Sequence, residues 1–221
     1  MALSIESSPS NKIIDVDEFI ELAASRVDPE DFQSLFSVID EFAALNNNRN
    51  FLVQHFNSEL KKVDVRRLAQ YLSPQSYVFG ASKCGSVAVR CNIWVKPDGS
   101  AEKQALEARI FSYGLAHNHN FSFLTVGYSG PGYRSKIYEV DPDSVSGYIG
   151  ESVKVQFLED TVLPKGKMMI YRRGIDVHTQ LPPEDISVSL NLLMAAPSNS
   201  SVVQYYVDTQ TGVIIGFPEV N

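Results

Sequence analysis

The chain has 221 residues, of which 44% are hydrophobic and 20% are charged. A composition this rich in apolar residues excludes an extended disordered protein. The 19 basic and 26 acidic residues give a formal net charge of −7, so we expect neither a nucleic acid nor an anionic membrane as a partner. The sequence opens without a basic region followed by an apolar run, and no stretch reaches the ~20 apolar residues of a membrane span. We therefore expect a cytoplasmic protein.

The residues from 13 to about 72 have the apolar spacing of amphipathic helices. Asp15, with Glu18 three positions later, is typical of a capping box at a helix start. Asp28 before Pro29 predicts a second helix, and the asparagines 46–48 predict its end. A third helix is expected near residues 51–60, and a short fourth between Asp64 and Pro74. The pattern predicts a helical segment over residues 1–75.

From about Ser76 the apolar period changes from 3.6 to 2 residues, the period of β-strands. A strand from Val87 to Val95 ends at a Pro-Asp-Gly turn, and further short strands are expected at about 105–113, 121–128, 133–140, 153–158, 167–172, 186–195, 201–208 and 211–217. Many short strands separated by turns are typical of an all-β barrel or jelly roll. We therefore expect a mainly β barrel over residues 76–221, with the helices packed against it as one folded unit.

Three of the four histidines fall in this β-rich half. His117 and His119 are two positions apart at the start of a strand, so both rings project from the same face. His178 lies just after a later strand, and a barrel that joins the two strands would complete a three-histidine metal site. Three protein ligands leave positions open for water, dioxygen or substrate. The alternative is that these are surface histidines. The fourth, His55, is interpreted as a core residue on a helix.

The pattern His117-x-His119, the strand from Phe121 to Gly127, then His178 and the strand 186–197, resembles the cupin superfamily. Within it, the order is similar to the cysteine dioxygenase (thiol dioxygenase) group, over a stretch from about Arg90 to Gly212. The resemblance implies a cupin-like jelly-roll barrel with an N-terminal helical segment packed against it. It also implies a non-haem Fe(II) centre held by the three histidines, and a carboxylate-binding arginine near Arg90.

Two departures from that group concern the chemistry. Residues 120–127 contain no acid, which favours three histidines alone over three histidines and a carboxylate. The group places Ser, His and Tyr at alternate positions of a late strand, and the matching residues here are Ser189, Asn191 and Leu193. The tyrosine that assists sulfur oxidation in the group is therefore missing, and its crosslinking cysteine has no counterpart near Leu124.

Polar residues of the late strand and three arginines are the other candidate site residues. Ser189 and Asn191 share a face, and would hydrogen-bond an imidazole or a substrate if this face lines the pocket, whereas the alternative is that it meets solvent. Arg90, Arg109 and Arg172 are candidates for substrate binding, because a guanidinium can bind a carboxylate through two hydrogen bonds.

The first functional hypothesis is a non-haem Fe(II)-dependent dioxygenase that acts on a small thiol or amino-acid-type substrate with dioxygen. The second is a cupin isomerase, lyase or hydrolase that uses Zn, Mn or Ni as a Lewis acid. The third is a non-catalytic cupin that binds a small ligand. Oxygen consumption separates the first from the second, and retained metal without turnover favours the third. The sequence predicts no oligomeric state.

Overall fold

The computed structural model describes residues 3–5, 10–61, 71–73, 75–195 and 202–218. The helices are α1 (Val16–Arg26), α2 (Ile39–Asn47), α3 (Phe51–Lys61) and α4 (Ala101–Ile110), with the 3-10 helices η1 (Phe32–Val38) and η3 (Pro142–Ser144). The strands are β1 (Leu3–Ile5), β2 (Tyr71–Ser73), β3 (Ser76–Ala81), β4 (Val87–Trp94), β5 (Phe123–Ser129), β6 (Arg134–Glu139), β7 (Gln156–Val162), β8 (Met168–Tyr171), β9 (Asp176–Leu181), β10 (Ser187–Met194), β11 (Tyr206–Asp208) and β12 (Val213–Gly216).

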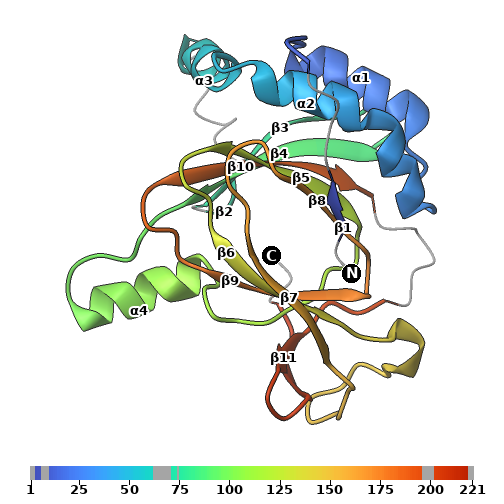
Figure 1. Cartoon of the computed structure of the whole chain (residues 1–221), viewed down its shortest axis with the longest axis vertical. Coiled ribbons are helices and arrows are strands. Elements are labelled where there is room, and N and C mark those ends of the chain that lie inside the picture. The colour runs from blue at the N-terminus through green and yellow to red at the C-terminus, as the bar shows by residue number, and fades with distance from the viewer. Residues whose placement is uncertain (1–2, 6–9, 62–70, 74, 196–201, 219–221) are drawn as a thin grey trace.

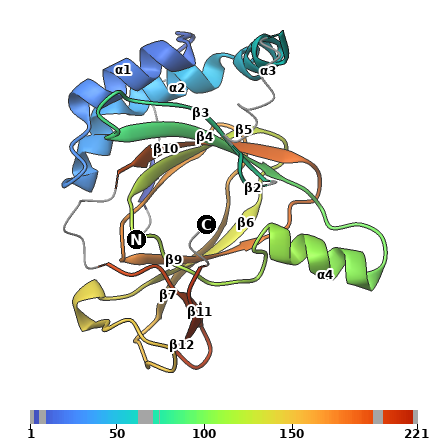
Figure 2. The ribbon, with the colours of Figure 1, turned by 180° about the vertical axis from the view of Figure 1, so that it is seen from behind.

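Two antiparallel sheets form the walls of a barrel. The larger sheet has the strand order β1-β8-β5-β10-β4-β3-β2 and the smaller has β7-β6-β9, while β11 and β12 form a separate hairpin. Helices α1, α2 and α3 cover the outer face of the larger sheet, opposite the smaller one (Figures 1 and 2). The protein is therefore mainly β, a jelly-roll barrel with N-terminal helices packed against one face, which confirms the predicted fold class.

The N-terminal helices pack on the sheet through a continuous apolar core. Helix α1 begins as predicted, because the Asp15 side chain accepts a hydrogen bond of 2.8 Å from the Glu18 N–H. The rings of Phe19 in α1 and Phe42 in α2 lie 5.3 Å apart, and both are fully buried. They belong to one core with apolar residues of β4, β5, β8 and β10. Helix α2 ends at Asn47, within the predicted asparagine run.

Strand β10 separates the core from the interior of the barrel. Its apolar residues Leu190, Leu192 and Met194 pack in the core under the helices. Because successive side chains on a strand alternate, Ser189 and Asn191 point the other way, into the barrel. Both are nearly inaccessible to solvent, at 1% and 3% exposure, since both faces of β10 are covered.

Several expected elements differ in the structure. The segment 105–113 is not a strand, because α4 runs from Ala101 to Ile110 behind an N-cap, where Ser100 Oγ accepts a hydrogen bond from the Lys103 N–H. Its residues are mostly strong helix formers, and this propensity outweighs the short alternation. The second helix start is a 3-10 turn capped by Asp31, three residues after Asp28.

Three smaller differences concern strands. The fourth helix expected before Pro74 falls partly on residues 62–70, outside the described residues, and the following Tyr71–Ser73 is strand β2. Strand β9, from Asp176 to Leu181, was not expected, so His178 lies within a strand instead of after one. The expected strand 201–208 is limited to Tyr206–Asp208. Among the described residues, the helices are all too short or too polar to cross a membrane.

Candidate metal centre

The three histidines come from two segments that lie side by side in the barrel. His178 is in the middle of β9, and His117 pairs with it as an isolated antiparallel bridge. Their backbones exchange two hydrogen bonds, from His117 N–H to His178 C=O at 3.1 Å and from His178 N–H to His117 C=O at 2.9 Å. His119 follows two residues later, and its carbonyl accepts from the Gly174 N–H at 2.8 Å. Backbone hydrogen bonds therefore hold the two segments side by side, independently of the histidine side chains.

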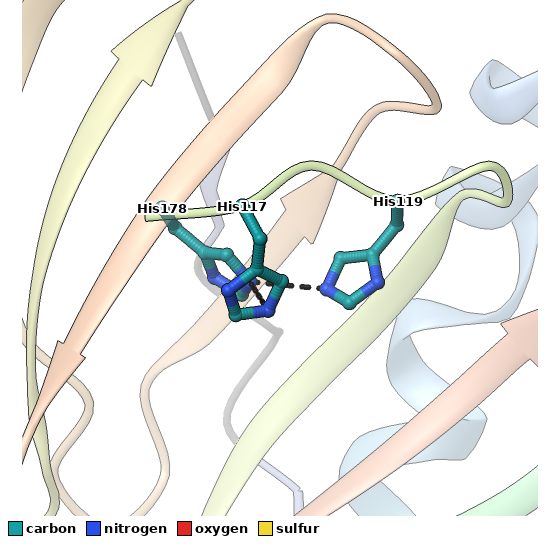
Figure 3. Close-up of side chains that lie close together, drawn as sticks. All are labelled: His117, His119 and His178. Atoms are coloured by element: carbon teal, nitrogen blue, oxygen red, sulfur yellow. Dashed lines mark hydrogen bonds between the residues drawn. The ribbon is translucent and has the colours of Figure 1, made fainter. Parts of the chain in front are cut away.

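The three imidazoles point toward one another (Figure 3). The Nε2 atom of His178 lies 3.0 Å from Nε2 of His119 and 3.2 Å from Nε2 of His117. One ring nitrogen from each residue lies within 4.8 Å of the others. Nitrogen ligands that share one divalent metal, each ~2.1 Å from it, are themselves ~3.0–3.4 Å apart. The three nitrogens therefore fit a single metal ion, and the structure brings all three predicted ligands together.

The environment keeps these rings neutral, which is the form that binds metals. Burial lowers the pKa of His117. Burial, with added repulsion from neighbouring histidines and Arg90, holds the pKa of His119 and of His178 well below the usual range. Protonating any of the three imidazoles would create a buried positive charge, and for His119 and His178 that charge would also lie near the Arg90 guanidinium. The cluster therefore offers three neutral imidazoles whose ring nitrogens converge.

The imidazoles have neighbours that the sequence analysis missed. His117 Nδ1 donates to the Leu115 carbonyl at 2.9 Å, which leaves its Nε2 lone pair free for a metal. The Gln180 amide nitrogen lies 3.1 Å from both Nδ1 and Nε2 of His178, and the Gln204 amide nitrogen lies 3.4 Å from His119 Nδ1. Gln180 could have been found from its position two residues after His178 on a strand, whereas Gln204 carries no such signal.

A cavity of about 160 Å³ opens beside the imidazoles. Besides the three histidines, it is lined by Gln75, Ser76, Arg90, Asn92, Trp94, Phe111, Ser112, Phe123, Tyr133, Gln180 and Asn191. Arg90, Asn92 and Trp94 are alternate residues of β4, so one face of that strand supplies a cation, an amide and an aromatic ring. The cavity therefore combines a possible metal site with groups that can bind a small polar molecule.

Arg90 is the predicted substrate-binding residue that the structure places in this cavity. Burial lowers its pKa to about 10, still far above neutrality, so it stays cationic. Its Nε atom is buried and has no hydrogen-bond partner among the described residues. A buried guanidinium with a free donor is costly unless a ligand supplies the acceptor. Arg90 therefore meets the physical requirements of an anion-binding group.

The other two arginines do not line the cavity. Arg172 donates to Asp176 at 2.7 Å and to Glu139 at 3.2 Å, so its charge is already neutralised within the fold. Arg109 is exposed on α4. Their proposed role in substrate binding therefore has no support from this cavity: the first is paired with carboxylates, and the second lies on a helix where a strand was expected.

Ser189 and Asn191 face the interior of the barrel and not the solvent, which were the two alternatives left by the sequence. Asn191 lines the cavity, and its amide donates to Asn92 Oδ1 at 3.2 Å. Ser189 Oγ accepts from Trp94 Nε1 at 3.0 Å. Within the described part of the chain, these hydrogen bonds join β10 to β4 and do not reach the imidazoles. Tyr133 also lines the cavity and adds a buried phenol, whose pKa is raised to about 12 by burial.

Comparison with known proteins finds solved structures of low sequence identity and low structural similarity. No family model and no curated protein matches the chain. Among solved structures, a hydroquinone 1,2-dioxygenase from Sphingomonas sp. TTNP3 is 9% identical, with 58% of this chain and 70% of that chain covered and a TM-score of 0.37. A DMSP lyase, DddQ from Ruegeria pomeroyi DSS-3, is 14% identical over 57% of this chain, with a TM-score of 0.29.

A vicilin from Corylus avellana is 11% identical, with 61% of this chain and 31% of that chain covered and a TM-score of 0.35. The chain spans about half the length of the DMSP lyases, at 49% and 48%. The neighbours thus include a dioxygenase and a lyase. At this degree of likeness they assign no family, and the chemistry of the site rests on the chain's own residues.

Proposed function

We propose that this protein is a metal-dependent dioxygenase of the cupin type, with His117, His119 and His178 holding Fe(II). The observation that carries the proposal is the convergence of three neutral Nε2 atoms beside a cavity that contains Arg90. Bound Fe(II) would supply the redox chemistry with dioxygen, and three protein ligands leave room for substrate at the metal. The substrate of this proposal is a small thiol or amino-acid-type molecule, as the resemblance implies, and the cavity of about 160 Å³ supports a small size.

The protein residues bind and orient this substrate. Arg90 binds its carboxylate with its guanidinium, of which Nε is a buried donor without a partner among the described residues. Asn191 and Asn92 are hydrogen-bonded to each other across β10 and β4. Their amide atoms outside this hydrogen bond can bind the polar atoms of the substrate. Trp94 stacks on Tyr133 with ring centroids 4.0 Å apart, and this pair forms an apolar wall that excludes water from one side.

The test begins with metal content. The purified protein should contain or take up one divalent metal, and the Fe(II)-loaded form should consume oxygen with cysteine, cysteamine or 3-mercaptopropionate. Chelation should abolish this consumption, and Fe(II) should restore it. His178→Ala should lose both metal and activity, while His55→Asn, which changes the histidine outside the cluster, should keep both. A protein that binds no divalent metal would exclude the proposal.

A second candidate is an isomerase, lyase or hydrolase that uses Zn, Mn or Ni as a Lewis acid. The observation that favours it is Leu193, which packs against the cluster of Trp94 and Tyr133, where the thiol dioxygenase group would place a tyrosine. An apolar side chain there removes one hydroxyl that would assist oxygen chemistry. Turnover under anaerobic conditions would establish this candidate, and strict dependence on oxygen would exclude it.

A further inference from the structure

A second cavity, of about 610 Å³, borders the segment that carries His117 and His119. Asn118 lines it, whereas the two histidines line the smaller cavity described above, and the two cavities have no described lining residue in common. Asn118 also holds one wall in place. Its amide donates to the Val203 carbonyl at 3.0 Å, and its Oδ1 atom accepts from the Tyr205 N–H at 2.8 Å. The larger cavity is therefore a separate space with a hydrogen-bonded wall.

Two polar side chains that line this cavity have buried atoms without a partner. The Nη1 atom of Arg173 and the hydroxyl of Tyr205 are both buried, and neither has a hydrogen-bond partner among the described residues. Tyr205 is 2% exposed, and burial raises its pKa to about 12, so its hydroxyl keeps its proton at neutral pH. The hydrogen bond that Arg173 does form comes from its backbone N–H, which donates to Ser122 Oγ at 3.0 Å. Buried donors without acceptors are costly, so an acceptor supplied by a ligand would stabilise both groups.

Two carboxylates line the same cavity without pairing with this arginine. Glu30 lies just before η1 and Asp143 lies in η3, and both residues are exposed. Within the described part of the chain, no ion pair joins either carboxylate to Arg173. A simple anion would therefore meet two negative charges here, and a simple amine would meet a guanidinium. The apolar side chains of Val145 and Ile175 complete the lining and can contact a short methylene chain.

We propose that this cavity is a binding site for a small zwitterion, a molecule with one carboxylate and one ammonium group, which is the chemistry of a free amino acid. The carboxylate of the ligand accepts hydrogen bonds from Arg173 and Tyr205. Its ammonium group pairs with Glu30 or Asp143. The inference does not rest on the proposed function, because none of these four residues lines the metal cavity.

The first experiment measures binding by isothermal titration calorimetry with glycine, 4-aminobutyrate and 6-aminohexanoate, which differ in the separation of their charges. Titrations use the wild type and Arg90→Met, because a carboxylate bound in the metal cavity is lost in that variant. At least one zwitterion should bind saturably to both proteins. The acid and the amine of the same chain length, each lacking one charge, should bind about 10-fold more weakly or less. Absence of saturable binding of all three zwitterions to Arg90→Met would overturn the inference.

The second experiment locates the bound zwitterion with variants of the larger cavity. Arg173→Met removes the guanidinium at similar length and should weaken binding by about 10–100-fold, the usual effect of losing a charged hydrogen bond. Tyr205→Phe removes only the hydroxyl and should weaken binding by about 2–10-fold. Arg109→Met, on the exposed helix α4, is the matched control and should bind like the wild type.

A third variant keeps the test decisive if Arg173→Met fails to fold. Glu30→Gln combined with Asp143→Asn changes two exposed side chains, so this double variant should unfold at the wild-type temperature. It should bind the zwitterion about 2–10-fold more weakly and the matched acid at least as tightly as the wild type does. Wild-type affinity for the zwitterion in this double variant, or in a folded Arg173→Met, would place the ligand elsewhere and overturn the inference.

Discussion

At the scale of single residues, Arg90 is the group that should make the cavity prefer an anionic ligand. Arg90→Met should weaken the binding of small carboxylates such as 3-mercaptopropionate by about 10–100-fold, since a charged hydrogen bond is worth ~1.5–3 kcal/mol. Trp94, the only tryptophan of the chain, lines the same cavity, so its fluorescence reports binding directly. Arg109→Met, on the exposed helix α4, is the control and should bind like the wild type. Unchanged affinity in Arg90→Met would exclude Arg90 as the anion-binding group.

The two cysteines should differ in reactivity and in its dependence on pH. Hydrogen bonds from Ser82 and Ser86 lower the pKa of Cys84 to about 7, while burial raises the pKa of Cys91 to about 11. The thiolate is the nucleophile, so alkylation of Cys84 should rise with pH, reach half its maximum near pH 7 and level off above it. Mass spectrometry after brief iodoacetamide treatment should find Cys84 modified and Cys91 intact. A Cys84 rate still rising steeply at pH 9 would contradict this prediction.

At the scale of elements, Gly132 allows the chain to enter β6 and carry Tyr133 into the barrel. Its φ is +86°, and a Cβ atom there would lie 2.1 Å from the Leu163 carbonyl oxygen. Gly132→Ala should therefore destabilise the protein by about 2–5 kcal/mol, from backbone strain and from the clash together. Gly85 has a similar φ of +74° with open space around it, so Gly85→Ala should cost only ~1–2 kcal/mol. Equal losses in urea unfolding would show that the close contact has no effect.

Helix α4 shows where a sequence pattern fails for a physical reason. None of its residues is buried, so the hydrophobic pattern that identifies amphipathic elements is absent. The segment 105–113 was predicted as a strand from a short alternation, although its helix-forming residues and the Ser100 cap favoured a helix. Strand β9 was missed for the opposite reason. Its residues 176–180 are all buried, and the polar ones His178 and Gln180 line the cavity while Asp176 pairs with Arg172, so apolar alternation is lost.

At the scale of the whole molecule, the barrel could be predicted because its period-2 strands and turns are local features of the sequence. The pair His117 and His119 could be predicted from its spacing, although the structure places the two residues before β5, with His117 in an isolated bridge and His119 outside any strand. The third ligand could be predicted only on the condition that a barrel joins the two segments, because its approach depends on long-range pairing. His178 meets Ile137 in the register of β6 with β9, and His117 on its other side. The positions of buried Gln180 and half-buried Gln204 depend on the same long-range contacts.

Metal binding should stabilise the entire fold, because the site joins the His117–His119 segment to β9. A ligand that binds only the native state adds about 2.7 kcal/mol at a concentration of 100 times its dissociation constant. For a chain of this size that corresponds to a rise in Tm of about 5–10 °C. Thermal unfolding should show this rise with Zn²⁺ or anaerobic Fe(II), and its reversal by a chelator.

His178→Ala separates specific from non-specific stabilisation. Without metal, the buried His178 ring is hydrogen-bonded to both other imidazoles, so the metal-free variant should unfold below the wild-type temperature, and the quantity to compare is the rise in Tm that metal adds to each protein. With metal, the variant has two ligands left and should show almost no rise in Tm. His55→Asn retains the cluster and should show the wild-type rise. If His178→Ala gained the same stability from metal as the wild type, the ion would be bound elsewhere, and the three converging imidazoles would not form the metal site.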